Sequence, residues 1–380
     1  MPSLRDALEA ALVEDPDDLA THRAYADYLQ EQGDPRGEFI QVQLALEDPQ
    51  RTAEERRELE RRERELLTEH ERKWLGILAD ELLGPADEPW ESSGEGVRPY
   101  EIRFVRGWLD RIARPEIDGF RRGGLLGRLL YKAPESRLLR EVILEYDEGD
   151  VKRLLHSPYL GNLRIFQLGE SDDASGLGSH RCEALPDFVA ILPRLEKMRL
   201  FVRGYDPAKL FALPNLTSLR VLQIHNLEER HPLEVLAENA ALSNLTHLLL
   251  HPHASRDVLI GLAGVRAVIQ SPHLRSLTHL QLRCSDLGDV GCTEIVTSGI
   301  LKRLKVLDLR HGEITDAGAR ILADCSDLQR LELLDIDRNG LTQTGIDALR
   351  RVLGDKLRAD DQQTAEELAF QYYLSESNWA

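Results

Sequence analysis

The sequence contains few cysteines, few aromatic residues and too few bases to balance its acids. Its 380 residues include 4 cysteines, and 48 basic residues stand against 66 acidic ones, which gives a formal net charge of −18. Four cysteines do not make a disulfide framework, so we expect a protein of the reducing cytoplasm. The negative charge argues against binding to nucleic acid or to an anionic membrane, because both need a basic surface.

Long apolar runs and the sequence motifs of common active sites are also missing. No stretch reaches the about 18 uncharged apolar residues of a membrane span, and charges within the first apolar run argue against a signal peptide. The sequence has no phosphate-binding loop, no dinucleotide-binding glycine motif, no nucleophile elbow and no CxxC or HExxH spacing. We therefore expect no catalytic residue, no metal and no cofactor, and we predict that the protein is not an enzyme.

One hexapeptide pattern recurs from residue 139 onward. An apolar residue is followed by a second one three positions later and a third one two positions after that. The eight segments begin at Leu139, Leu163, Leu195, Leu219, Leu245, Leu277, Leu304 and Leu328, with spacings of 24, 32, 24, 26, 32, 27 and 24 residues. Because side chains alternate between the two faces of a strand, the last two apolar positions of each segment are predicted to face one core.

The segments between the hexapeptides, such as residues 316–323 and 344–353, have helical character. Strand–helix units that are stacked repeatedly predict an α/β solenoid, with a parallel sheet on the concave side and helices on the convex side. A small all-α unit precedes this array.

The segment Leu304-Lys-Val-Leu-Asp-Leu-Arg-His-Gly-Glu-Ile-Thr-Asp-Ala-Gly-Ala, partly repeated at residues 341–349, resembles a leucine-rich repeat of the longer, ribonuclease-inhibitor-like kind. The resemblance covers roughly residues 136–354 and implies binding of a protein on the concave face. The family usually closes the turn after each strand with an asparagine. Gly312 stands at that point in one repeat, Asn226 lies one residue early, and Asn339 is displaced by an apparent two-residue insertion around residues 335–336.

Residues 1–48 predict a small helical unit. Ser3 and Asp6 are placed to cap its first helix, and Gly33 to end its second. The string Tyr25-Ala-Asp-Tyr-Leu-Gln-Glu-Gln-Gly-Asp-Pro-Arg-Gly-Glu-Phe-Ile-Gln-Val-Gln resembles a short bacterial repeat-companion domain, which implies company with repeats and no activity. Four polar residues of the string are either a docking or active surface or the caps and ion pairs of a loop: Asp27, Asp34, Arg36 and Glu38.

The remaining boundaries follow from composition and pattern. Residues 49–83 predict one long, charged amphipathic helix, and residues 84–99 predict a linker. Residues 100–135 predict a hairpin, with Gly107 in its turn, that caps the N-terminal edge of the array. Residues 136–354 are the predicted array, and residues 355–380 are a C-terminal helical cap or a partner-binding tail.

The outward positions on the predicted sheet form three columns of side chains. In the middle repeats these columns carry lysine, arginine and histidine with almost no acid, although the chain as a whole is acidic. We predict a surface that binds an acidic or aromatic partner and whose histidines make binding depend on pH near neutrality; chance variation at solvated positions is the alternative. The predicted partner-binding residues are Lys197, Arg199, Phe201, His225, His247, Leu249, His251, His279, Arg283 and Arg310. The same alternation predicts that Arg330, Glu332 and Leu334 point outward in the last repeat.

The leading functional hypothesis is a non-catalytic recognition or scaffold protein, a monomer or part of a hetero-complex, that binds a protein partner. A second hypothesis is an effector or enzyme whose activity resides in the N-terminal helical unit, with the repeats as its sensor. A third is an inhibitor of a basic enzyme, suggested by the overall acidity and the repeat type.

Overall fold

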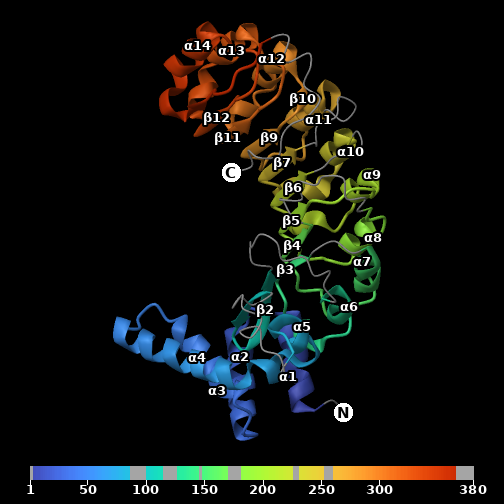
Figure 1. The fold of residues 1–380 in the computed structure, drawn as a ribbon, viewed down its shortest axis with the longest axis vertical. Coiled ribbons are helices and arrows are strands. Elements are labelled where there is room, and N and C mark those ends of the chain that lie inside the picture. The colour runs from blue at the N-terminus through green and yellow to red at the C-terminus, as the bar shows by residue number, and fades with distance from the viewer. Residues whose placement is uncertain are drawn as a thin grey trace. The chain divides into compact units, whose positions relative to one another are not determined.

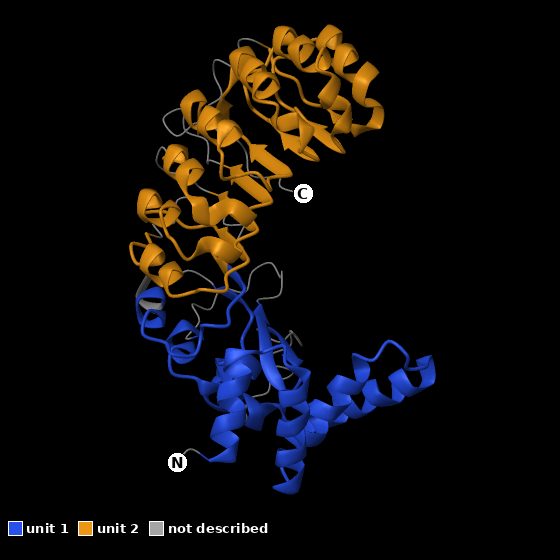
Figure 2. Cartoon of the chain, turned by 180° about the vertical axis from the view of Figure 1, so that it is seen from behind, with its two compact units in different colours: residues 1–166 blue, residues 167–380 orange. Residues whose placement is uncertain are grey.

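The computed structural model describes residues 3–85, 100–113, 126–144, 148–169, 181–225, 231–251 and 260–364. The chain forms two compact units, residues 1–166 and 167–380 (Figure 2). The boundary falls within strand β4 (Ile165–Leu168), so the first strand of the predicted array belongs to the same unit as the N-terminal helices. Within the described residues, no helix combines the length and the apolar character that crossing a membrane requires.

The first unit begins with helices and continues with a hairpin. Its helices are α1 (Leu4–Glu14), α2 (Leu19–Glu31), α3 (Arg36–Leu46), α4 (Ala53–Leu75), η1 (Gly76–Leu78), α5 (Ala79–Leu83), α6 (Leu126–Leu130), η3 (Pro134–Ser136) and α7 (Glu148–Leu154). Its strands β1 (Glu101–Val105), β2 (Trp108–Ala113) and β3 (Glu141–Leu144) lie in that order, β1 antiparallel and β3 parallel to β2. The predicted capping box is present, because the Ser3 and Asp6 side chains bond each other's backbone N–H groups.

The single helix predicted for residues 49–83 is broken at Gly76. This residue has a positive φ of 52°, which ends α4 and starts the short helix η1. A Cβ atom on Gly76 would lie 2.1 Å from Oε1 of Glu135, so only glycine fits there without displacing that carboxylate. The linker predicted to follow, except for residues 84 and 85, lies outside the described residues.

The helices and the hairpin of the first unit share one apolar core. Leu12, Tyr25, Ala26, Leu29, Ile40, Trp108 and Leu138 form a buried cluster, and the rings of Tyr25 and Trp108 stack with their centroids 5.6 Å apart. The Gln43 amide of α3 donates to the Phe104 carbonyl at 3.0 Å and accepts from Gly107 N at 2.7 Å. Gly107 has a φ of 78° and lies in the hairpin turn, as predicted.

The second unit consists of strands on one side and helices on the other (Figure 1). Seven strands follow one another in the sheet, and each neighbouring pair is parallel: β5 (Lys197–Leu200), β6 (Val221–His225), β7 (His247–His251), β9 (His279–Leu282), β11 (Val306–Asp308), β12 (Leu333–Asp335) and β13 (Leu357–Arg358). The helices that cover them are α8 (Leu185–Ala190), α9 (Pro207–Phe211), α10 (Leu233–Glu238), α11 (Leu262–Gln270), α12 (Gly288–Ser298), α13 (Asp316–Ala323) and α14 (Gln343–Leu353). Short strands β8 (Ile260–Gly261) and β10 (Ser285–Asp286) pair separately.

The predicted alternation is confirmed in the first seven hexapeptides. Their last two apolar residues are at most 4% exposed: Val142, Leu144, Phe166, Leu168, Met198, Leu200, Leu222, Ile224, Leu248, Leu250, Leu280, Leu282, Leu307 and Leu309. The α/β leucine-rich repeat fold predicted from the sequence is therefore the observed fold.

The register predicted for the last repeat is wrong. Leu334 pairs with Leu307 and is buried, whereas Leu333 is half-exposed, so the true segment runs from Leu331 through Leu334 to Ile336. The outward residues are accordingly Leu333, Asp335 and Asp337, in place of Arg330, Glu332 and Leu334.

In the corrected register Asn339 stands at the position expected for the family's asparagine, and no insertion displaces it. Asn339 is fully buried, and its Oδ1 accepts hydrogen bonds from Gly312 N at 3.0 Å and Ile314 N at 2.9 Å. Its amide donates to the carbonyls of Leu309 and Ile336, each at 3.0 Å. One side chain therefore ties the turns of two successive repeats together. Asn226 lies outside the described residues.

A second polar ladder joins the helix starts of the last repeats. Asp289 accepts from Thr315 N at 2.9 Å and from Gly318 N at 2.8 Å, and Asp316 accepts from Thr342 N and Gly345 N in the same way, at 2.8 and 3.1 Å. A Cβ atom on Gly318 would lie 2.4 Å from Oδ1 of Asp289, so the repeated Thr-x-x-Gly spacing reflects the close approach of each helix to the preceding one.

The part of the C-terminal segment that the structure describes ends the sheet with a strand. After η9 (Gly354–Lys356), β13 pairs with β12, and Leu357 is 9% exposed. The helix expected in this segment is predicted for residues 365–374. Residues 365–380 lie outside the described residues.

We predict that Asn339→Ala lowers the free energy of unfolding by about 3 kcal/mol, because two buried N–H groups and two carbonyls lose their partners. Urea unfolding followed by circular dichroism measures this change. Asn244→Ala is the matched control, since Asn244 is exposed and donates one hydrogen bond, to Thr217 O at 2.8 Å. Equal effects of the two substitutions would contradict the role assigned to Asn339.

Candidate functional site

The predicted partner-binding residues of β5, β6, β7 and β9 come together on one face of the second unit. In the first column Lys197 pairs with Val221, Val221 pairs with His247, and His247 pairs with His279. In the second column Arg199 pairs with Gln223, and this pairs with Leu249. Since neighbouring strands lie about 4.8 Å apart, side chains of one column touch or nearly touch. All of these outward residues are partly exposed, whereas the residues between them are buried.

The third column contains a row of neighbouring rings that are tilted against one another. The ring centroids of Phe201 and His225 are 4.4 Å apart, and those of His225 and His251 are 5.3 Å apart. Gln223 Nε2 lies 2.7 Å from His225 Nε2 and holds that ring from the neighbouring column. His251 is 4% exposed, so it packs against His225 and offers little surface to a partner.

The two histidines of the first column form a separate stack. The rings of His247 and His279 are 3.9 Å apart and nearly parallel, at 14°. Each Nδ1 lies next to the hydroxyl of the preceding threonine, at 2.8 Å for Thr246 and 2.9 Å for Thr278. These contacts help to hold the two rings in their stacked arrangement.

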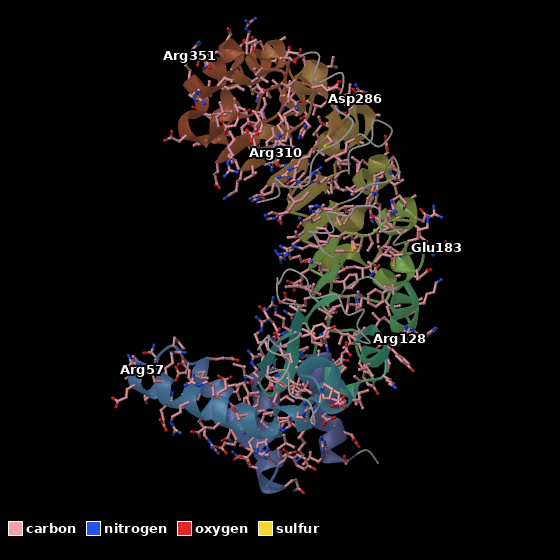
Figure 3. All side chains as sticks on the ribbon, in the orientation of Figure 1. Arg57, Arg128, Glu183, Asp286, Arg310 and Arg351 are labelled. Carbon is pink, nitrogen blue, oxygen red and sulfur yellow. The ribbon has the colours of Figure 1, made fainter. Side chains whose placement is uncertain are left out.

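Arg283 and Arg310, predicted to meet an acidic partner, instead meet acids of the same surface. Asp308 is 5% exposed, and its Oδ2 lies 2.9 Å from Arg283 Nε and 2.9 Å from a terminal nitrogen of Arg310. Arg310 Nε also lies 3.3 Å from Oδ2 of Asp335. Figure 3 shows Arg310 on the strand side of the second unit. The positive charge of these two arginines is therefore compensated within the chain.

Sequence reasoning missed the part that Asp308 and Asp335 play in this network. Asp308 was not among the predicted partner-binding residues, and the wrong register of the last repeat hid Asp335. The spacing Asp308-x-Arg310 puts both side chains on one face of the chain, which is the signal that pointed to an internal pair.

Arg199 keeps an unused donor. Its Nε atom is buried and makes no hydrogen bond to any residue that the structure describes. It lies beside Gln223 in the second column, next to the ring row that begins at Phe201.

Burial lowers the pKa values of the surface histidines. It lowers the pKa of His225 to about 4, with the nearby Arg283 and Arg199 acting in the same direction. Burial also lowers the pKa values of His247 and His279. These three histidines are neutral at pH 7. The pH dependence of partner binding that was expected near neutrality is therefore expected at lower pH.

The polar residues singled out in the N-terminal string have separate local roles, with one exception. Glu38 pairs with Arg62 at 2.6 Å, Asp27 accepts from Gln41 at 3.0 Å, and Asp34 accepts from the backbone N–H of Arg36 at 3.0 Å. Arg36 is the exception, because its guanidinium lies over the rings of Trp74 and Trp108. Among the described residues, no group of three or more histidines, cysteines or acids could hold a metal ion.

Comparison with known proteins places the repeats in a known class. Residues 273–296 and 303–323 match the family model described as Leucine Rich repeat. The solved structure of a protein from Bacteroides fragilis is similar at 16% sequence identity, over 84% of this chain and 87% of that one, with a TM-score of 0.51. Internalin C2 from Listeria monocytogenes is 17% identical over 57% of this chain and 84% of its own, with a TM-score of 0.31. No curated protein sequence is significantly similar.

Together with the observed strand–helix repeats, these findings identify the chain as a leucine-rich repeat protein. The repeat-companion domain at its N-terminus remains a prediction, as do the domain boundaries and the partner-binding residues.

We predict that Arg283→Glu lowers the free energy of unfolding by about 3–5 kcal/mol, because it places a second acid against the buried Asp308. Urea unfolding of the full chain measures the change. Arg220→Glu makes the same chemical change at an exposed position and should shift stability by less than about 0.5 kcal/mol. An Arg283→Glu variant as stable as the Arg220→Glu variant would refute the internal pairing.

His225 should make the fold less stable in acid. Its pKa is lower in the folded chain than its ordinary value of 6.5, so the unfolded chain binds the proton more tightly. The stability from this residue is complete above pH 6.5 and is lost as the pH falls toward 4. At pH 4.5 the loss amounts to about 2 kcal/mol. Urea unfolding at pH 7.5 and 4.5 should show a smaller difference for His225→Gln than for the wild type, and equal differences would contradict the shift.

Proposed function

We propose that this leucine-rich repeat protein is a non-catalytic recognition protein that binds a protein partner on the outward strand face of its second unit. The observation that supports this most is the strand register, which aligns Lys197, Arg199 and Leu249 with the ring row beginning at Phe201. Positive and apolar side chains thus share one partly exposed surface in a chain of net charge −18. A cytoplasmic protein, monomeric or in a hetero-complex, is part of the same proposal.

The partner segment should combine an acid with an aromatic or aliphatic side chain. A carboxylate that pairs with the partly exposed Arg199 side chain makes a charge-assisted hydrogen bond, worth about 1.5–3 kcal/mol. Phe201 and Leu249 offer apolar contact area beside it. Because Arg283 and Arg310 are held by Asp308 and Asp335, the centre of the proposed surface is on β5, β6 and β7 and not on β9 and β11.

Inhibition of a basic enzyme, the third hypothesis, would need an acidic binding surface. The centre of the outward face on β5 to β7 has the opposite sign, so this hypothesis finds no support on that face.

Selection from a random-peptide library displayed on phage tests the proposal with the full chain as bait. We expect enriched peptides that carry Asp or Glu close to an aromatic or aliphatic residue. The double variant Lys197→Glu/Arg199→Glu should bind a synthetic enriched peptide at least about 10-fold more weakly than the wild type, by fluorescence anisotropy.

The matched control is Arg350→Glu/Arg351→Glu, which changes the net charge equally at exposed positions of α14, on the helix side (Figure 3). This control should bind as the wild type does. Enriched peptides that bind the Lys197→Glu/Arg199→Glu variant undiminished, while its urea unfolding curve stays that of the wild type, would place recognition elsewhere.

A further inference from the structure

The C-terminal tail, residues 365–380, has an unusual composition. It contains four aromatic side chains in 16 residues, whereas aromatic residues make up 6% of the whole chain. It also contains three glutamates and no lysine, arginine or histidine. These residues lie outside the part of the chain that the structure describes. Their sequence nevertheless combines acids with aromatic side chains, which is the chemistry proposed above for a partner of the strand face.

The strand face of the second unit offers the complementary surface. Lys197 and Arg199 of β5 are partly exposed, and Arg199 forms no ion pair with an acid that the structure describes. Phe201 and Leu249 are partly exposed as well and supply apolar contact area. An acidic segment with aromatic side chains therefore finds both positive charge and apolar surface on these strands.

The tail begins within reach of this surface. The described chain ends at Thr364, one residue after Gln363, whose backbone N–H donates to the Asn339 carbonyl just beyond β12 at 2.7 Å. Five strand spacings separate β12 from β5, which is about 24 Å. The residues from 365 to 376 span up to about 40 Å when extended. If residues 365–374 form the predicted helix, the span is about 22 Å, and long side chains cover the rest.

The acids on the strands between β12 and β5 do not prevent this approach. Asp308 is 5% exposed and Asp335 is 2% exposed, and both lie within ion-pair distance of Arg310. They therefore present little negative charge to an acidic segment that crosses them.

Chain length also decides which glutamate of the tail can reach β5. Glu366 and Glu367 are two and three residues from the last described residue, so they lie within about 10 Å of it. Only Glu376 is far enough along the tail to reach the bases of β5. It stands between Tyr373 and Trp379, so an acid and aromatic side chains arrive there together.

We propose that residues 372–380 bind the strand face of their own chain and compete there with the protein partner. Glu376 pairs with Lys197 and Arg199, and the aromatic side chains on either side of it pack on Phe201. Because the tail is tethered, its effective concentration at the face is in the millimolar range, so a weak contact is sufficient. This inference rests on the function proposed for the strand face and adds autoinhibition to it.

Carbodiimide cross-linking of the full wild-type chain tests the contact directly. The reagent joins a carboxylate and a neighbouring amine as an amide and takes up the water that is released. Mass spectrometry of the monomeric fraction should find Lys197 joined to Glu376. The pair Lys209 and Asp187, 2.6 Å apart, is the positive control. The proposal is wrong if the control link forms without the Lys197–Glu376 link, or if that link occurs only in covalent dimers, which would assign the tail to a second copy.

Competition with the partner is tested by the full-length variant Glu376→Lys. A peptide enriched in the phage selection should bind it about 10-fold more tightly than the wild type, by fluorescence anisotropy, if the tail occupies about nine-tenths of the faces. Glu366→Lys makes the same charge change in the same tail, out of reach of β5, and should bind as the wild type does. Unchanged affinity in Glu376→Lys, or an equal gain in Glu366→Lys, would overturn the competition.

The two proposals for the strand face fail separately. If Lys197→Glu/Arg199→Glu weakens peptide binding but Glu376→Lys does not strengthen it and the cross-link is absent, the tail proposal is wrong and partner recognition stands. If the Lys197–Glu376 cross-link forms but Lys197→Glu/Arg199→Glu binds every enriched peptide undiminished, the face binds the tail and partner recognition lies elsewhere.

Discussion

The parallel register of the strands is the constraint on which the second unit depends. Each repeat places two alternate apolar side chains into the core, and each strand pairs residue for residue with the next, as in Leu222, Leu248 and Leu280. A shift by one residue would turn buried leucines to solvent, so the core holds the register. The outward columns are a consequence: once the leucines are buried, Lys197, Arg199 and Phe201 have only one face on which to lie.

Polar side chains stabilise this arrangement where leucines cannot. Asn339 and the ladder from Asp289 to Asp316 satisfy backbone groups at the turns and helix starts of successive repeats. Asp308 does similar work on the outward face, where it holds Arg283 and Arg310. A charged side chain on the strand face can therefore either stabilise the chain or contact a partner. Whether it already pairs with another residue of the chain distinguishes these two roles. Arg199 is partly exposed and forms no ion pair with an acid that the structure describes, so it is the better candidate for recognition.

In the first unit, not every buried charged group has a partner of opposite charge. Its helices and hairpin close around one apolar cluster, yet Arg36 lies between aromatic rings without an acidic partner, close to indole N–H groups that are also unsatisfied. Elsewhere in the same unit, Glu9 and Asp110 are surrounded by arginines.

The sequence alone was sufficient for the fold class, the buried leucines of seven repeats, the capped first helix and the turn at Gly107, because each depends on a local period or a local cap. It was not sufficient for the last repeat, where Leu328-x-x-Leu331-x-Leu333 and Leu331-x-x-Leu334-x-Ile336 both satisfy the pattern. Pairing of Leu334 with Leu307 chooses between them. The compensation of Arg283 and the packing of Arg36 against Trp74 and Trp108 likewise needed the folded chain, since these residues are far apart in sequence and meet only through long-range packing.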